Sequence, residues 1–276
     1  MIVSPFTPLF FSTGKSDGIE SEYLQTFSVD DRIFLQLIGS ENWNGKAEIH
    51  FEPDHRLLCQ IIFQKWKMND STCVLFSSIS LNPGVYSITV SGMGTCEWFK
   101  VTDDKRELKN TTLIQYSMKN NRQRNDVVFF IDHMQYFFDF RVPGGFKDSN
   151  WSFGVESEQF VTQTSDIVQL YGLESTQKIF TLGSNIGVPI WFGEMLNRIL
   201  VCSHVYFNGE KYTRKDSNVP EITVLLEGVN SFIFNQKLQR SVNLDPVIEH
   251  NNNIIMRRTP ENIFREIEGD NPRIVN

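Results

Sequence analysis

Short apolar runs separated by turn signals constrain the fold of this chain more than any other feature. Leu57–Phe63 and Val85–Val90 are rich in aliphatic and aromatic residues, and turn dipeptides such as Asn208-Gly209 separate such runs. The chain holds 23 Phe but a single alanine, Ala47, so the best helix former is nearly absent and a good strand former is abundant. Many short strands at regular spacing are typical of a β-sandwich or barrel, and we predict an all-β fold. The predicted strands are Ala47–Phe51, Leu57–Phe63, Val85–Val90, Trp98–Val101, Val127–Ile131, Tyr136–Val142, Ile167–Tyr171, Ile199–Phe207, Ile222–Leu226 and Phe232–Phe234.

Pairs of similar segments at a nearly constant offset suggest an internal duplication. The segments are 18–22 (GIESE) with 154–158 (GVESE), 32–39 with 165–172, and 86–90 with 221–224. The period is too long for a solenoid, so each copy is expected to be a whole domain. We predict β-sandwiches at residues 1–134 and 135–254, followed by a tail at 255–276.

The joins between these parts differ in character. Val127–Phe140 is almost continuously apolar, which indicates two domains packed together rather than joined by a flexible tether. In the tail, Thr259 and Pro260 predict the start of a short helix that carries Ile263, Phe264 and Ile267. Two interpretations of this helix stay open: it docks on its own domain, or it binds a partner.

Charge and cysteine content exclude several functional classes. The net charge of −7 argues against nucleic acid as a direct partner. No apolar run approaches the ~20 residues needed to span a bilayer, so no membrane partner is expected, and residues 1–11 are predicted as a first strand rather than a signal peptide. The four cysteines form no CxxC pair, which favours free thiols and a cytoplasmic location, with the nucleus as a further compartment.

The segment 47–58 (AEIHFEPDHRLL) is the most informative for function. In a strand, Glu48, His50 and Glu52 face one side and the apolar residues between them face the other. A polar, ionisable face of this kind suits a sheet surface that binds a polar ligand. The same pattern is also that of an ordinary amphipathic strand in a sandwich.

Several segments resemble the galectins, which are β-galactoside-binding lectins with a concanavalin-A-like sandwich. His50–Pro53 resembles their His-Phe-Asn-Pro-Arg strand, and Ile33–Leu37 and Trp98–Val101 resemble flanking strands. In the second half, Val188–Phe192 and Asn208–Lys211 resemble the His-Phe strand and the Asn-Gly-x-Trp turn. The resemblance implies two tandem galectin-like sandwiches and, in the family, a site for a galactoside.

The sugar-contacting set that the resemblance implies is incomplete in both halves. His50 is kept, but Glu52 replaces an Asn and Asp54 replaces the Arg. The other ligand-binding candidates are Arg56, Gln60 and Trp66 in the first half and Trp191, Ser203, His204 and Tyr212 in the second. Each missing hydrogen bond costs ~1 kcal/mol, so weak sugar binding is not expected to survive.

We therefore predict a non-catalytic scaffold that binds a protein partner. Such a scaffold is expected to expose an apolar patch larger than a few hundred Å². The alternative is a lectin of altered specificity that binds a glycan, which requires His50, Arg56 and Trp66 to cluster and face solvent.

Catalytic, metal and cofactor sites have little support. Glu48–Glu52 resembles the Glu-x-Asp-x-Glu strand of laminarinase-type glycoside hydrolases, but His50 replaces the central Asp. A retaining enzyme would need the two carboxylates roughly 5–5.5 Å apart. Strand alternation is expected to place His50 and His55 on opposite faces, which argues against a metal site. No cofactor is expected, because the sequence has neither a GxGxxG motif nor a P-loop.

Overall fold

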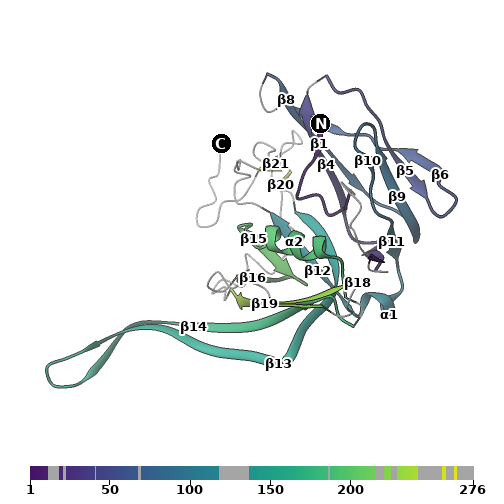
Figure 1. The fold of residues 1–276 in the computed structure, drawn as a ribbon. Helices are drawn as coiled ribbons and strands as arrows, with labels where there is room; N and C mark the ends of the chain where they lie inside the picture. Colours follow the sequence, from purple (N-terminus) through teal and green to yellow (C-terminus); the bar gives the residue numbers. More distant parts are fainter. Residues whose placement is uncertain are drawn as a thin grey trace.

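Strands dominate the computed structural model of the chain, which confirms the predicted all-β class (Figure 1). The structure describes residues 1–11, 19–20, 23–40, 42–67, 70–117, 137–185, 187–214, 221–224, 229–241, 257–258 and 264–265. No helix among these residues has the length and apolar character needed to cross a membrane.

Two facing sheets make up the first part of the chain. One has the order β1 (Ile2–Val3), β4 (Ile33–Ser40), β8 (Thr72–Ile79) and β7 (Gln64–Lys67). The other has the order β3 (Gln25–Ser28), β11 (Phe99–Thr102), β9 (Gly84–Val90), β5 (Ala47–Phe51) and β6 (Arg56–Gln60), with β10 (Gly94–Thr95) paired to β9. Alternate residues of both sheets, including Leu35, Ile49 and Ile88, meet in one apolar core. This part is therefore sandwich-like.

The sheet that contains β4 and β8 is a middle layer with apolar contacts on both faces. Ile33, Leu35 and Leu37 enter the core of the first sandwich, whereas Phe34 and Phe76 enter a second core formed with the rest of the chain. Burial on both faces explains why the sequence of β4 is mostly apolar instead of alternating between apolar and polar residues.

The second sheet system closes on itself, unlike the sandwich predicted for residues 135–254. Its strands are β12 (Thr111–Ser117), β13 (Phe138–Val161), β14 (Ile167–Leu182), β15 (His204–Phe207), β16 (Glu210–Arg214), β17 (Glu221–Val224) and β19 (Phe232–Arg240). They pair in the order β14-β13-β12-β15-β16-β19, β17 adds to β19, and β14 also pairs with β19. This last pairing completes the ring.

Helix α2 (Ile190–Ile199) packs into the core of the closed sheet and corrects two strand predictions. It occupies most of the segment assigned to the His-Phe strand, and the strand predicted from Ile199 begins only at His204. Four side chains at helical spacing are buried on one side of it, namely Phe192, Met195, Leu196 and Ile199. A Cβ on Gly193 would lie 2.4 Å from the Phe234 ring, so glycine permits this close packing.

The structure also changes the predicted boundary between the halves. β12 falls within the predicted first domain, yet it pairs with β13 and β15 and so belongs to the second sheet system. A short helix, α1 (Lys105–Leu108), lies between β11 and β12. Residues 118–136, which include the predicted strand Val127–Ile131 and the boundary at 134, lie outside the described residues.

Two of the three pairs of similar segments occupy positions that are not equivalent, and residues 18, 21 and 22 of the remaining pair lie outside the described residues. Residues 33–39 lie in β4 of the middle layer, whereas 167–172 lie in the far part of β14. Residues 86–90 lie in the central strand β9, whereas 221–224 form β17, which pairs only with β19 among the described strands. These segments therefore give the duplication no structural support.

Short strands remain near the ends of the chain. β2 (Ile19–Glu20) pairs in parallel with β18 (Val229–Asn230), and β20 (Arg257–Arg258) pairs with β21 (Phe264–Arg265). Phe264 therefore lies in a strand rather than in the predicted helix, because Arg258 is its partner across the pair. Ile263 and Ile267 lie outside the described residues.

Polar contacts join the two parts beside the shared core. Arg141 donates from Nε and Nη2 to the two carboxylate oxygens of Asp31, at 2.6 and 2.7 Å. The backbone N–H of Arg32 donates to Asp139 Oδ2 at 2.9 Å. The parts are therefore held in a defined orientation by directional bonds as well as by apolar packing.

Candidate functional site

The predicted two-faced character of β5 is confirmed. Ala47 and Ile49 are buried in the sandwich core, and Phe51 packs against it. Glu48, His50 and Glu52 alternate with these residues and so face the opposite side of the sheet.

Glu52 is the anchored carboxylate of this face. Its Oε1 accepts a hydrogen bond from Ser87 Oγ at 2.6 Å and lies 3.0 Å from His55 Nδ1. Burial by itself raises the Glu52 pKa, but the hydrogen bonds from Ser87 and His55 and the charge of His55 outweigh it and hold this pKa below its usual value. The carboxylate therefore fixes the turn after β5 in place.

His50 and His55 stack on each other, which corrects the expectation that they lie on opposite faces. Their ring centroids are 4.0 Å apart and their planes differ by 2°. The reason is the turn between β5 and β6, in which His55 has a positive φ of 50° and leaves the alternation of the strand. No group of three or more His, Cys, Asp or Glu side chains within the described ranges is placed to hold a metal ion.

The residues required for a lectin site do not come together. Arg56 pairs with Phe51 across the strands, and its guanidinium carbon lies 5.5 Å from the Phe51 ring centroid, on the face opposite His50. Trp66 lies on β7 of the other sheet and packs against the core of the closed sheet. Gln60 donates to Glu48 Oε1 at 3.2 Å. The predicted cluster of His50, Arg56 and Trp66 is therefore not formed.

The two carboxylates of a glycosidase pair do not converge either. Glu48 bonds to Gln60, whereas Glu52 bonds to Ser87 and His55. Four residues of extended strand separate their Cα atoms by about 13 Å. Each carboxylate is therefore held by its own partners rather than turned toward the other.

The four candidates of the second half are scattered. Trp191 lies half-buried on α2, Ser203 lies in the exposed turn before β15, and His204 begins that strand. Tyr212 is buried in the core of the closed sheet, where its hydroxyl donates to Glu210 Oε2 at 2.8 Å. Burial raises the Tyr212 pKa, with the neighbouring Glu210 adding to the effect. These side chains form no common site.

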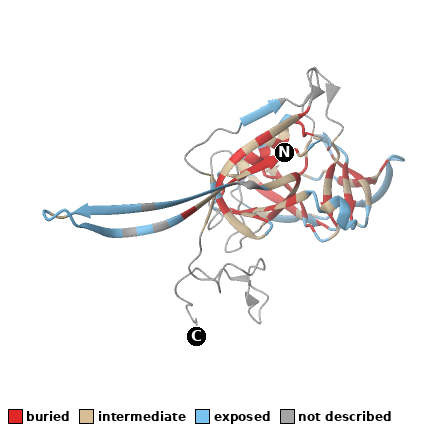
Figure 2. Cartoon of the chain, turned by 90° about the horizontal axis from the view of Figure 1, so that it is seen from below, coloured by how far each residue is buried: buried red, intermediate tan, exposed pale blue. Residues whose placement is uncertain are grey.

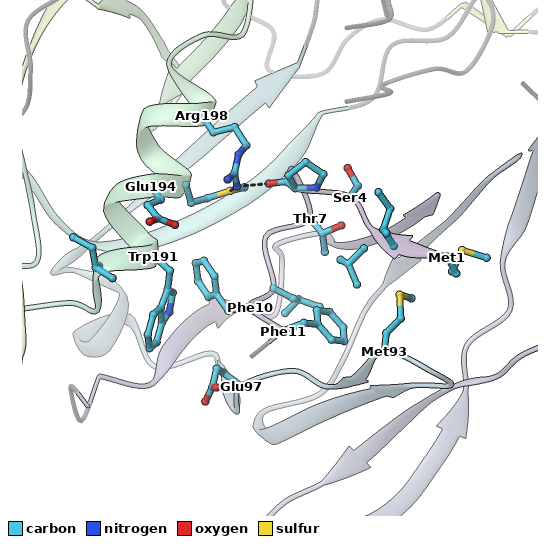
Figure 3. Close-up of a pocket in the computed structure, with 16 residues that line it drawn as sticks. Met1, Ser4, Thr7, Phe10, Phe11, Met93, Glu97, Trp191, Glu194 and Arg198 are labelled. Atoms are coloured by element: carbon cyan, nitrogen blue, oxygen red, sulfur yellow. Dashed lines mark hydrogen bonds between the residues drawn. The ribbon is translucent and has the colours of Figure 1, made fainter. Parts of the chain in front are cut away.

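A cleft of about 590 Å³ lies between the first residues of the chain and α2 (Figure 3). Phe10, Phe11 and Trp191 give it an aromatic lining, and Glu194 stands at its edge (Figure 3). Arg198 crosses from the helix and donates to the Pro5 carbonyl at 2.7 Å. The volume falls within the range of small-molecule pockets, but Trp191 is the one predicted ligand-binding residue in this lining.

The most prominent surface is a long two-stranded projection, which we call the arm (Figure 1). It consists of β13 and β14 from Trp151 to Lys178, paired from Trp151–Lys178 to Val161–Ile167. β12 pairs with β13 only as far as Pro143, and β19 pairs with β14 only from Thr176 onward. Beyond the Phe153–Thr176 pair the arm is therefore a ribbon of two strands, roughly 24 Å long at ~3.4 Å per residue.

Apolar side chains are exposed along this arm, much of which is drawn as exposed in Figure 2. Trp151, Phe153 and Val155 are 40%, 75% and 68% exposed and alternate along β13. The apolar side chains exposed toward the tip are Phe160, Val161, Ile167, Val168 and Leu170. Neither group was identified as a site from sequence. The available signal was the alternation of Trp151, Phe153 and Val155 with small residues.

Comparisons with known proteins add no assignment. No family model matches the chain, and neither a curated protein nor a solved structure matches it significantly.

Proposed function

We propose that this chain is a non-catalytic binding protein that recognises a protein partner through its arm. The observation that carries the proposal is the exposed apolar surface of β13 and β14. Large side chains present about 150–250 Å² each, so the exposed fractions of the eight apolar residues leave roughly 800 Å². Apolar surface on this scale marks an interaction site, and about 800 Å² per partner is the size of a standard protein interface.

The architecture of the arm supports the same proposal. A two-stranded ribbon is marginally stable by itself, because neither face has a core and both edges have free backbone groups. A partner that covers the apolar side chains would supply the missing burial. Ser152 and Gly154 alternate with Trp151, Phe153 and Val155 and so lie on the other side of the ribbon near its base.

The first part of the molecule supports a galectin-like scaffold whose sugar chemistry has been lost. The first part has two facing sheets, and the outer face of β5 is polar, as in the strand that His50–Pro53 resembles. Arg56 and Trp66 are committed to other contacts, which weakens the lectin alternative. The free cysteines, three of them buried, favour a reducing compartment.

Site-specific photo-crosslinking tests the proposal. A photoreactive phenylalanine analogue replaces Phe153 in one variant and Ile62 in a control, because Ile62 is 88% exposed and lies far along the chain from the arm. Irradiation in an extract of the source cells is expected to join position 153 to a defined protein, with the crosslinked peptide identified by mass spectrometry. The proposal would be refuted if the adducts formed at position 153 were no more abundant and no more specific than those formed at position 62.

A further inference from the structure

The cleft beside α2 has walls from three separate segments of the chain (Figure 3). Residues 1–11 form one wall and α2 forms another, while Met93 and Glu97, which flank β10, complete the lining. The walls are fixed in place, because the backbone N–H of Glu97 donates to the Phe10 carbonyl at 2.7 Å and the buried side of α2 is packed in the core of the closed sheet. The cleft is therefore pre-formed, as ligand pockets usually are.

An aromatic pair, Phe10 and Trp191, lies at one end of this cleft. The two ring centroids are 6.3 Å apart, and Phe10 also packs on Phe192 of the buried side of α2, with centroids 4.7 Å apart. Trp191 is half-buried and lines the cleft, so part of its indole is available to a ligand. The face of an aromatic ring carries partial negative charge, and tryptophan attracts cations most strongly. This end of the cleft therefore suits a positively charged group.

Two carboxylates flank the aromatic pair and add to the same preference. Glu194 follows Trp191 by three residues on α2, and residues at this spacing are neighbours on the surface of a helix. Glu97 is joined to Phe10 by the backbone hydrogen bond described above. Figure 3 shows the two carboxylates on either side of the aromatic pair. A cation at this end would meet ring faces and carboxylates together.

The positive charges of the lining are directed elsewhere. Arg198 lies one turn beyond Glu194, but its Nη1 donates to the Pro5 carbonyl at 2.7 Å and lies 3.9 Å from Met195 Sδ. Over the described ranges, no hydrogen bond or ion pair engages the Glu194 carboxylate, although the spacing to Arg198 would allow one. The amino group of Met1 lies at the end of the cleft away from the aromatic pair (Figure 3). The Glu194 carboxylate therefore keeps its acceptors for a ligand.

The remainder of the cleft is mostly apolar. Its volume of about 590 Å³ lies within the range of pockets that enclose small organic molecules. The apolar side chains of this lining are Val3, Leu9, Phe11, Met93 and Met195. Such a lining would cover a hydrocarbon or aromatic body attached to the charged group.

We propose that this cleft binds a small organic cation with an apolar body. The ammonium group lies against Trp191, between Glu194 and Glu97, and the apolar body extends toward Phe11 and Met93. An anion would face two carboxylates, and an uncharged body would take water from them without replacing its hydrogen bonds. The net charge of −7 adds a long-range attraction for cations. The inference goes beyond the proposed function and does not depend on it, because the arm contributes no residue to the cleft.

Isothermal titration calorimetry of the full chain with three matched probes tests the proposal. The probes are phenylbutylammonium, phenylbutanol and phenylpentanoate, which share one apolar body and differ in the charge of the head group. The ammonium probe is expected to bind at least about tenfold more tightly than the alcohol, and the carboxylate more weakly than both. High salt is expected to narrow the difference between the ammonium probe and the alcohol.

Three variants locate the site. Glu194→Gln changes an exposed side chain, so the fold is retained, and it is expected to raise the dissociation constant of the ammonium probe about fivefold while that of the alcohol stays unchanged. Trp191→Met keeps an apolar side chain but removes the ring, and it is expected to weaken the ammonium probe more than the alcohol. Glu158→Gln removes an exposed carboxylate of the arm and is expected to change neither constant. Circular dichroism reports whether each variant retains the strands of the wild type.

The opposite results are equally specific. Equal affinity for the ammonium probe and the alcohol, tighter binding of the carboxylate, or no binding of any probe overturns the proposal. An effect of Glu194→Gln no larger than that of Glu158→Gln also overturns it, since the cation would then bind elsewhere. Crosslinking from position 153 on the arm is independent of all these outcomes, so the proposed function stands or falls separately.

Discussion

Replacing Asp31 by alanine removes the ion pair that joins the two parts of the molecule most directly. The Asp31 side chain is 2% exposed and that of Arg141 is 13% exposed. The carboxylate accepts two hydrogen bonds from Arg141, at 2.6 and 2.7 Å, and one from the backbone N–H of Ser28 at 2.7 Å. Asp31→Ala therefore leaves a largely buried guanidinium and a buried N–H without their acceptor.

The expected loss of stability is large for a single substitution. Breaking a buried pair costs about 3–5 kcal/mol, and the partial exposure of Arg141 places this case near the lower end, at about 3 kcal/mol. Arg141 keeps one bond, from Nη1 to Thr111 Oγ1 at 3.2 Å. Arg141→Met is expected to cost about 2–3 kcal/mol, because it leaves Asp31 uncompensated but fills the space.

A double-mutant cycle measured by urea unfolding provides the assay. The combined Asp31→Ala, Arg141→Met variant is expected to lose about 2–4 kcal/mol, less than the sum of the single losses, with a coupling of at least about 1.5 kcal/mol. The exposed pair Lys100–Glu107, with a 2.6 Å contact, is the matched control, and its disruption is expected to cost under about 1 kcal/mol. Strict additivity, or an Asp31→Ala loss no larger than the control, would refute the reasoning.

Two further predictions concern the polar sheet face and the thiols. Since the folded pKa of Glu52 is held below its usual value, its ionised form stabilises the protein above the unfolded pKa, and this contribution is lost as the pH falls through the folded pKa. Glu52→Gln is expected to lower the free energy of unfolding by about 1–2 kcal/mol at pH 7. It is also expected to flatten the decline of this free energy below about pH 4. Urea titrations measure both effects, and equal slopes of this free energy against pH in the variant and the wild type would contradict the prediction. Of the four free cysteines, Cys59 is exposed, whereas burial raises the pKa of the Cys96 thiol to about 12. A thiol reagent is expected to label Cys59 rapidly in the native protein, and Cys59→Ser is expected to abolish this rapid labelling. Rapid labelling of the buried Cys96 would contradict the fold.

Local patterns predicted several strands of the first part, among them β5, β9 and β11, but not β8. The alternation in Ala47–Phe51 correctly assigned His50 to the side of β5 away from the sandwich core, because burial of the other side constrains the register, although His50 itself is also buried. The relation of His50 to His55 was wrong, since a positive φ in the turn breaks the alternation on which the argument relied.

Helix α2 shows why the second part was harder to predict. Its buried residues recur at helical spacing, but Ile190, Trp191 and Phe192 also suit a strand, and the near absence of alanine argued against any helix. The core of the closed sheet decides the outcome by burying Phe192 and Leu196 on one side. Closure of the second sheet depends on the pairing of β14 with β19, and no local sequence pattern predicts a pairing between strands so far apart in the chain.

The arm shows a different limit of sequence reasoning. Alternation in Trp151–Val155 assigns the apolar side chains to one face, but it does not say whether another part of the chain covers that face. An exposed apolar patch of the expected kind lies on β13 and β14. Exposure of this kind becomes visible only in three dimensions.

Amide hydrogen exchange along the arm tests the central claim most directly. In an uncovered ribbon, the amides of residues 151–161 and 167–175 open frequently, because only strand pairing protects them. The account predicts that these amides become markedly slower to exchange when the protein captured at position 153 is bound, while the amides of β9 stay unchanged. Exchange along the arm that is equally fast with and without that protein would contradict the claim that the arm is a binding surface.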